Sequence, residues 1–255
     1  MGMHEGNRKK IHVVLSKEEI DRQKIDTRKV AVVFDVLLAT TTVSALLQYG
    51  AKGIIPVMDG KEALSMLKTL DDDHVILAGE VNGQTIEGFE DPIAARLKES
   101  IEGKTVILST TNGTVAIRKV DSAKKVYAAS LLNAAAVSER IIADHQDDTI
   151  LVVCAGSGGQ FSMEDFYGAG MFINELLTED VAWTLTDSAK AALFFYQGNQ
   201  DRAAEILKAS RTGAMMVEAD LLEDVLFATE KGTVSVVPEL EDGQLVVATK
   251  KILQR

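Results

Sequence analysis

Short runs of apolar, often β-branched residues recur along the chain, and each is followed by a polar turn and then by a stretch with helical spacing. Residues 30–34 are apolar at every position, which predicts a strand with both faces buried. Comparable runs predict further strands over residues 11–15, 53–58, 75–78, 105–108, 125–128 and 149–154. This alternation is typical of a three-layer α/β/α fold with a mostly parallel sheet.

The stretches between the apolar runs predict helices over residues 40–49, 61–70, 114–119, 133–145 and 162–177. Ser162, with Asp165 three positions later, resembles a capping box at the start of the last of these helices. A further helical stretch, from about residue 188 to residue 230, is interrupted near Gly198 and near residues 211–213.

The end of the chain predicts a departure from the parallel pattern. Residues 234–237 and 245–248 are apolar runs joined through a turn with Asp242 and Gly243, which predicts an antiparallel hairpin and hence a mixed sheet. No linker rich in Pro, Gly or Ser divides the 255 residues, so we expect a single α/β domain over residues 1–255.

Composition and charge narrow the classes of function. The hydrophobic share of 46% is enough for a core, and no apolar run approaches the roughly 20 residues of a membrane helix, so we expect no membrane partner. The formal net charge of −11 argues against nucleic acid as a partner. The single cysteine, Cys154, and a beginning without an apolar signal region favour a cytoplasmic protein.

Acidic side chains follow several predicted strands, at the positions where ligands bind in open α/β sheets. Asp35 directly follows the fully apolar run, Glu80 follows a later strand, and Glu164 and Asp165 begin a helix. Converging carboxylates suit Mg²⁺, which keeps waters and a substrate phosphate as its further ligands. The alternative is structural, because a strand can end at an acidic residue and acidic residues in a first helical turn stabilise the helix dipole.

Hydroxyl and glycine residues precede predicted helices at the same strand ends. They are Thr40, Thr41, Thr42, Thr110, Thr111, Asn112, Gly113, Ser157 and Gly158. Free backbone N–H groups at a helix start favour an anion, so these residues are candidates for binding phosphate. The alternative is that they form ordinary helix caps and a tight glycine turn.

Several phosphate-handling motifs are absent. Neither GxxxxGK[ST] nor a GxGxxG after a strand occurs, and Leu37 stands where an Asp-x-Asp phosphatase pattern needs its second acid. Gln160 stands six residues after Cys154, where a cysteine phosphatase needs arginine, so we expect Cys154 to be a buried strand residue. The residues alone predict an α/β protein with a magnesium and anion site at its strand ends.

Several longer blocks stand in order between about residues 30 and 240. They are AVVFDVLLATTT, VILAGEVNG with IEGFED, VILSTTNGTVAI, VVCAGSGGQFSMEDFYGAG, SRTGAMMVEADLLEDVLFAT and VSVVPEL. Together they resemble the blocks of the 2-phosphosulfolactate phosphatase (ComB) family. The resemblance implies a ComB-like fold and a magnesium-dependent hydrolase that converts 2-phosphosulfolactate and water into 3-sulfolactate and phosphate, a reaction of coenzyme M biosynthesis.

The resemblance also implies roles for individual residues. Asp35, Glu80 and Asp165 match catalytic positions, and Asp35, Glu80 and Glu164 match candidate Mg²⁺ ligands. The threonine segments would hold phosphate or sulfonate oxygens of a small phosphorylated or sulfonated acid, while a water or a carboxylate attacks phosphorus. The family also suggests a homo-oligomer.

Three departures from the family pattern leave an alternative open. Leu38 and Gln160 stand where many members carry a basic residue, and residues 88–93 lack the Gly-Asn-Ser portion of the family block. A charge-assisted contact is typically worth roughly 1.5–3 kcal/mol, so two losses would weaken catalysis unless other cations compensate. The candidates for compensation are Arg96, Arg118 and Arg211. The alternative is a divergent, weakly active or inactive homologue that binds a small anion or a protein partner.

Overall fold

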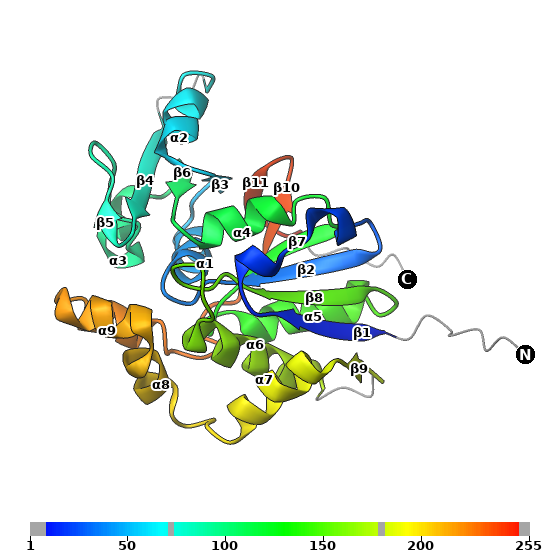
Figure 1. Ribbon diagram of the computed structural model, residues 1–255. Helices are drawn as coiled ribbons and strands as arrows, with labels where there is room; N and C mark the ends of the chain where they lie inside the picture. Colours follow the sequence, from blue (N-terminus) through cyan, green and yellow to red (C-terminus); the bar gives the residue numbers. More distant parts are fainter. Residues whose placement is uncertain (1–8, 71–73, 178–181, 250–255) are drawn as a thin grey trace, which may run out of the picture.

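The computed structural model describes residues 9–70, 74–177 and 182–249. Its strands are β1 (Lys10–Val14), β2 (Lys29–Phe34), β3 (Gly53–Val57), β4 (Val75–Val81), β5 (Gln84–Thr85), β6 (Thr105–Ser109), β7 (Lys125–Ala129), β8 (Thr149–Cys154), β9 (Thr184–Leu185), β10 (Pro238–Glu241) and β11 (Gln244–Val247). They form one 11-stranded sheet in the order β5-β4-β6-β3-β11-β10-β7-β2-β8-β1-β9 (Figure 1). The predicted α/β fold with a mixed, mostly parallel sheet is confirmed.

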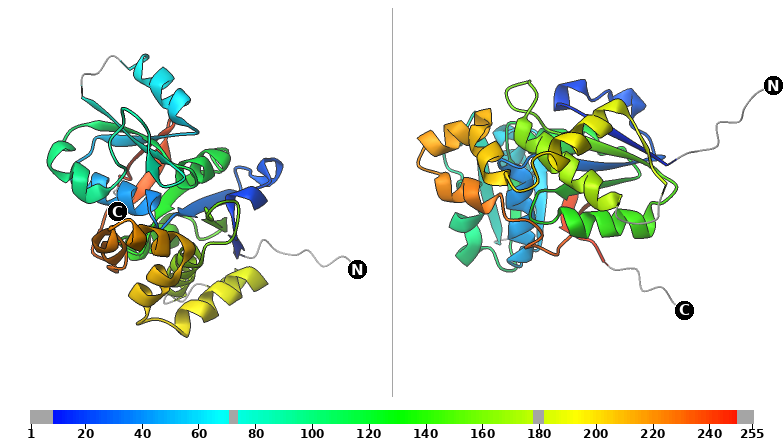
Figure 2. Two further views of the ribbon diagram at one scale, coloured as in Figure 1. Left: turned by 60° about the vertical axis from the view of Figure 1, so that its left-hand side comes forward. Right: turned by 90° about the horizontal axis from the view of Figure 1, so that it is seen from below.

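Helices pack on both faces of this sheet (Figure 2). They are α1 (Ala39–Gln48), α2 (Gly60–Leu67), α3 (Ala94–Leu97), α4 (Gly113–Lys119), α5 (Ala134–Asp144), α6 (Met163–Leu176), α7 (Asp187–Gln197), α8 (Ala203–Ala209), α9 (Arg211–Glu218) and α10 (Leu222–Phe227), with the 3₁₀ turns η1 (Lys17–Glu19), η2 (Arg22–Lys24) and η3 (Lys98–Ser100). Among the described residues, no helix is long and apolar enough to cross a membrane.

Strand β2 shows how the layers are held together. Its side chains alternate between faces, so that Val30, Val32 and Phe34 join the core shared with α5, α6 and α7. Ala31 and Val33 join the core shared with α1 and α4 on the other face. All five residues are fully buried, as the unbroken apolar run predicts.

Apart from the edge strand β5, which pairs antiparallel with β4, and the hairpin β10–β11, the sheet consists of two parallel blocks that run in opposite directions. The first block is β7-β2-β8-β1-β9 and the second is β4-β6-β3, with the hairpin β10–β11 between them. The pairings β7–β10, β10–β11 and β11–β3 are all antiparallel, so the chain direction reverses three times from one block to the other. This reversal decides which strand ends can meet at a common site.

The first strand of the hairpin lies four residues later than the sequence pattern predicts. The apolar run at residues 234–237 predicts that strand, whereas β10 starts at Pro238. The physical reason is the two-residue turn, because Asp242 and Gly243 have φ values of 48° and 82° and the residues flanking them must pair with each other. Val234 instead donates its backbone N–H to the carbonyl of Leu132, at 3.0 Å.

The helical stretch near the end of the chain is divided into α7, α8, α9 and α10. Helix α7 ends before Gly198, as predicted. The next break lies at Ser210 rather than at residues 211–213, because Ser210 caps α9 and its Oγ accepts the N–H of Gly213 at 3.1 Å. Another break, which the sequence analysis does not identify, lies at Asp220, where φ is 60°.

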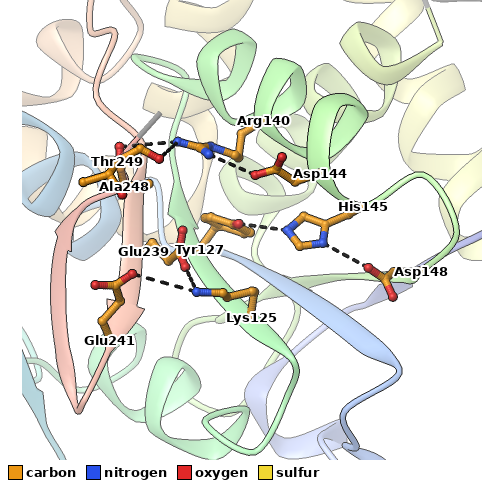
Figure 3. A network of polar contacts seen from close by, with 10 residues as sticks. All are labelled: Lys125, Tyr127, Arg140, Asp144, His145, Asp148, Glu239, Glu241, Ala248 and Thr249. Carbon is orange, nitrogen blue, oxygen red and sulfur yellow. Dashed lines mark hydrogen bonds and ion pairs between the residues drawn. The ribbon is translucent and has the colours of Figure 1, made fainter. Parts of the chain in front are cut away.

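Polar side chains join β7 to the hairpin and to the end of α5 (Figure 3). The Tyr127 hydroxyl and His145 Nε2 are 2.9 Å apart, and His145 Nδ1 lies 3.0 Å from Asp148 Oδ2. Lys125 forms an ion pair with Glu239 of β10. The backbone ladder between β7 and β10 has one residue pair, Tyr127 with Glu239, so these side chains supply much of the connection.

Candidate active site

A cavity of about 490 Å³ lies where loops from both blocks of the sheet meet. Asp35 follows β2 and Ser157 follows β8 of the first block, while Glu80 lies near the end of β4 and Thr110 follows β6 of the second. Residues at or after the carboxyl ends of strands from both blocks therefore line one cavity, although the two blocks run in opposite directions. Apolar side chains form another part of the lining: Leu37, Leu38, Ile93, Met215, Met216 and Leu221.

Asp35 is buried at this junction, with only 5% of its surface exposed, and hydrogen bonds fix its position. The Thr40 hydroxyl donates to the Asp35 carbonyl at 2.9 Å and accepts the Asp35 N–H at 3.0 Å. The carboxylate accepts the backbone N–H groups of Ala39 and Gly113. Gly113 is required here, because a Cβ at that position would lie 2.5 Å from Asp35 Oδ2.

The surroundings of Asp35 disfavour its charged form. Burial, and then the negative charges of Glu80 and Glu164, raise the pKa of Asp35 to about 7. The two backbone N–H donors oppose this increase only in part. The largest influences on Asp35 include two carboxylates and no cation, so a positive charge at this position would relieve the repulsion.

Glu80 joins the two loops of the second block that face the cavity. Its Oε1 accepts the backbone N–H of Thr111 at 2.7 Å, and its Oε2 accepts the Thr111 hydroxyl at 3.1 Å. Oε2 also accepts the N–H of Gly83, at 2.7 Å, in the turn between β4 and β5. The Glu80 carboxylate therefore both lines the cavity and fixes the position of Thr111.

Asp165 does not make the capping box that its spacing predicts. Ser162 does begin α6, but its hydroxyl is buried without a hydrogen-bond partner among the described residues. Asp165 instead accepts the N–H of Val36 at 2.8 Å and the N–H of Gly156 at 3.0 Å. The carboxylate is 2% exposed and joins the loop after β2 to the loop after β8, so it supports the cavity without lining it.

Glu164 completes the group of buried carboxylates. It is 2% exposed, and its Oε2 is buried with no hydrogen-bond partner in the described part of the chain.

Burial, and then the charges of Asp35 and Glu164, raise the pKa of Asp165 well above its usual range. Burial also raises the pKa of the Cys154 thiol, with the charges of Asp165 and Glu164 adding to the effect. Cys154 is thus a buried strand residue rather than a ready nucleophile.

The three consecutive threonines of α1 are buried and do not line the cavity. Thr41 donates its hydroxyl to the carbonyl of Val36 at 2.8 Å, and Thr42 donates to the carbonyl of Pro92 at 2.7 Å. Thr40 and Thr41 therefore fix the loop that carries Asp35, while Thr42 joins α1 to the loop before α3. The predicted anion-binding residues that do line the cavity are Thr110, Thr111, Asn112, Ser157 and Gly158.

Two of the three arginines considered for compensation line the cavity. Arg96 does so while paired with Asp91, and Arg211 contributes from the start of α9. Arg118 is directed elsewhere, since its Nη1 donates to Glu62 at 3.0 Å. A cation that the sequence analysis does not identify is Lys17, whose Nζ donates to Asn112 Oδ1 at 2.8 Å. Lys17 stands in a charged segment that has no local feature to distinguish it from a solvated surface.

Comparison with known proteins connects this site to a family. A sequence model of the family described as 2-phosphosulpholactate phosphatase matches residues 14–243. The chain is 34% identical over 239 residues to a protein of Clostridium beijerinckii named "Probable 2-phosphosulfolactate phosphatase", covering 92% of this chain and 98% of the relative. A Thermotoga maritima protein with the same name is 38% identical over 222 residues, covering 86% and 92%. The chain belongs to the 2-phosphosulfolactate phosphatase family.

The blocks that resemble this family, apart from VSVVPEL at residues 234–240, converge at the cavity. The loops after β2, β4, β6 and β8 all contribute to the cavity, and the block that contains α9 covers it. Among the departures, Leu38 lines the cavity and adds no charge. Gln160 is exposed and outside the lining, and its backbone closes a tight turn with Ser157 through hydrogen bonds of 3.0 and 3.1 Å. The altered segment at residues 88–93 also reaches the lining, through Asp91, Pro92 and Ile93, so the departures at position 38 and in this segment both change the cavity wall.

Proposed function

We propose that the protein hydrolyses the phosphate ester of 2-phosphosulfolactate, or of a related small phosphorylated acid, with the help of Mg²⁺. The products would be 3-sulfolactate and phosphate. Family membership and the names of the relatives support this reaction. The observation that carries the proposal is the buried Asp35 carboxylate, next to further carboxylates, at a cavity whose polar lining suits an anion.

The carboxylates around Asp35 suit a divalent cation. Glu80 and Glu164 are the charges that act most strongly on Asp35, and Glu164 Oε2 is a buried oxygen without a partner among the described residues. Among the described residues, no group of three or more His, Cys, Asp or Glu side chains is placed so that it could hold a metal ion. Mg²⁺ needs no such cage, since one or two carboxylates, waters and the substrate phosphate commonly complete its coordination.

Asp35 would hold Mg²⁺ together with Glu80 or Glu164. When bound, the ion would neutralise phosphate charge and make phosphorus more electrophilic. The remaining work falls to the residues of the chain. Thr110, Asn112 and Ser157 line the cavity and would supply hydrogen bonds to phosphate oxygens. Attack by a water and attack by a carboxylate are both compatible with this arrangement.

Phosphate release from 2-phosphosulfolactate, measured with Mg²⁺ and with EDTA, tests the proposal. We expect turnover that requires Mg²⁺ and falls roughly 100-fold or more in Asp35→Asn, since this substitution removes a ligand or proton acceptor from the site. Asp147→Asn at an exposed position is the matched control and should retain full activity. A folded wild-type protein that releases no phosphate from this or related phospho-acids would refute the enzyme and leave an anion-binding homologue. We further expect a cytoplasmic homo-oligomer, which size-exclusion chromatography with light scattering can test.

A further inference from the structure

Arg211 lies against the glycine turn that follows β8. Its Nη1 would be 2.9 Å from a Cβ added at Gly158, so the guanidinium lies close to the backbone of this turn. The neighbouring Thr212 donates its hydroxyl to Ser157 Oγ at 3.1 Å and fixes the start of α9 on the same turn. Arg211, Ser157 and Gly158 all line the cavity. The arginine is thus built into the cavity wall, although its side chain remains accessible.

The Arg211 guanidinium has no hydrogen-bond or ion-pair partner within residues 9–70, 74–177 and 182–249. The other cation in the cavity lining, Arg96, is neutralised by its ion pair with Asp91. Leu38, Met215 and Met216 form apolar parts of the wall. Among the described residues that line the cavity, Arg211 is therefore the one cation that is free to pair with an acidic group of a ligand.

Arg211 and Asp35 belong to different parts of the cavity wall. Arg211 lies against Gly158 in the loop after β8, whereas the Asp35 carboxylate accepts the backbone N–H groups of Ala39 and Gly113 at the starts of α1 and α4. Under the proposed function the phosphate group would lie near Asp35, because Mg²⁺ would be held there. The acidic group that remains on the organic part of the substrate would then lie toward α9.

We propose that Arg211 binds the acidic group of the substrate that is not hydrolysed, and so makes the enzyme select phosphorylated acids over simple phosphate monoesters. This inference rests on the proposed function and names the residue that sets its specificity. A guanidinium offers a planar pair of N–H donors that matches a carboxylate or a sulfonate in two-point contact. Lysine would retain the charge but lose this fork, whereas glutamine would lose both.

The test compares four phosphate monoesters that carry different acidic groups. They are 2-phosphosulfolactate, 2-phospholactate without the sulfonate, 2-(phosphooxy)ethanesulfonate without the carboxylate, and isopropyl phosphate without either. In Arg211→Gln we expect kcat/KM to fall about 10- to 100-fold on the substrates that carry the recognised acid, chiefly through KM, and to change less than about threefold on isopropyl phosphate. Arg211→Lys should fall between Arg211→Gln and wild type.

The control is Arg202→Gln, which removes the same charge from an exposed arginine that pairs with Glu205 outside the cavity. It should behave as wild type on all four substrates. A loss confined to substrates with the sulfonate identifies the sulfonate as the group that Arg211 binds, and a loss confined to those with the carboxylate identifies the carboxylate. Equal losses on all four substrates, or no loss, overturn the inference while leaving a phosphatase in place.

Binding of 3-sulfolactate, measured by calorimetry with wild type and Arg211→Gln, separates this inference from the proposed reaction. If the wild-type protein releases no phosphate but binds 3-sulfolactate at least about tenfold more tightly than Arg211→Gln, the anion contact stands and the phosphatase does not. If wild type neither turns over nor binds, both are refuted.

Discussion

The crowded carboxylates make the stability of the protein depend on pH in an unusual direction, and Asp35→Asn isolates that effect. Asp35 has a pKa of about 7 in the folded protein, against an ordinary value of 3.8. Between these values the folded state keeps a proton that the unfolded state releases. The free energy of unfolding must therefore fall as pH rises through this window.

The magnitude follows from the same two values. A difference of about three pH units, at about 1.4 kcal/mol for each unit, corresponds to about 4 kcal/mol at pH 8. Asparagine has nearly the shape of aspartate, and its amide oxygen can still accept the N–H groups of Ala39 and Gly113. Asp35→Asn should therefore resemble wild type near pH 4 and exceed it in stability by about 4 kcal/mol at pH 8.

The assay is urea unfolding in EDTA between pH 4 and pH 8, for wild type, Asp35→Asn and the exposed control Asp147→Asn. The difference in unfolding free energy between variant and wild type at each pH removes the contributions of other titrating groups. One of these is His145, whose pKa is lowered chiefly by burial and whose contribution has the opposite pH dependence. Added Mg²⁺ should stabilise wild type at pH 8 and have little effect on Asp35→Asn. A stability difference that stays flat with pH, or a variant less stable than wild type at pH 8, would show that the carboxylates do not repel one another as argued.

Two further substitutions test how the site and the sheet are supported. Asp165→Ala should destabilise the protein by about 2–5 kcal/mol and reduce phosphatase activity, because it leaves the buried N–H groups of Val36 and Gly156 without an acceptor. Asp165→Asn keeps one acceptor and should lose less in the same urea titration, so equal losses would contradict this role. Tyr127→Phe should cost about 1 kcal/mol through the lost contact with His145, while Tyr49→Phe at a half-buried position serves as its control.

The strands and the strand-end loops were predictable from sequence because their signals are local. Residues 30–34 are buried on both faces, and an unbroken apolar run of this length between polar turns is typical of such a strand. Asp35 directly follows that run, so its place at the sheet edge follows from the strand itself. The resemblance to a known family located the same loops independently, through blocks that the fold brings to one cavity.

Other parts of the site depend on contacts between residues far apart in the chain. Asp165 has the spacing of a capping residue, yet its partners are Gly156 and Val36, the second of them 129 residues away. Nothing in the local sequence distinguishes these two uses of an acidic side chain in a first helical turn. Lys17 likewise contacts Asn112 across 95 residues, and Arg211 reaches the cavity only because Ser210 starts a new helix there.

The reversal between the two blocks explains why the cavity depends on such distant contacts. The hairpin β10–β11 pairs with β7 and with β3 through one residue pair each, so few backbone hydrogen bonds join the two blocks. At the cavity the blocks meet through side chains, with Asp35 accepting the N–H of Gly113 and Lys17 binding Asn112. The groups proposed to bind metal and phosphate are therefore also groups that hold the two blocks together. A ligand that neutralises Asp35 would strengthen this junction, so substrate or metal binding and the stability of the sheet should respond to the same charge.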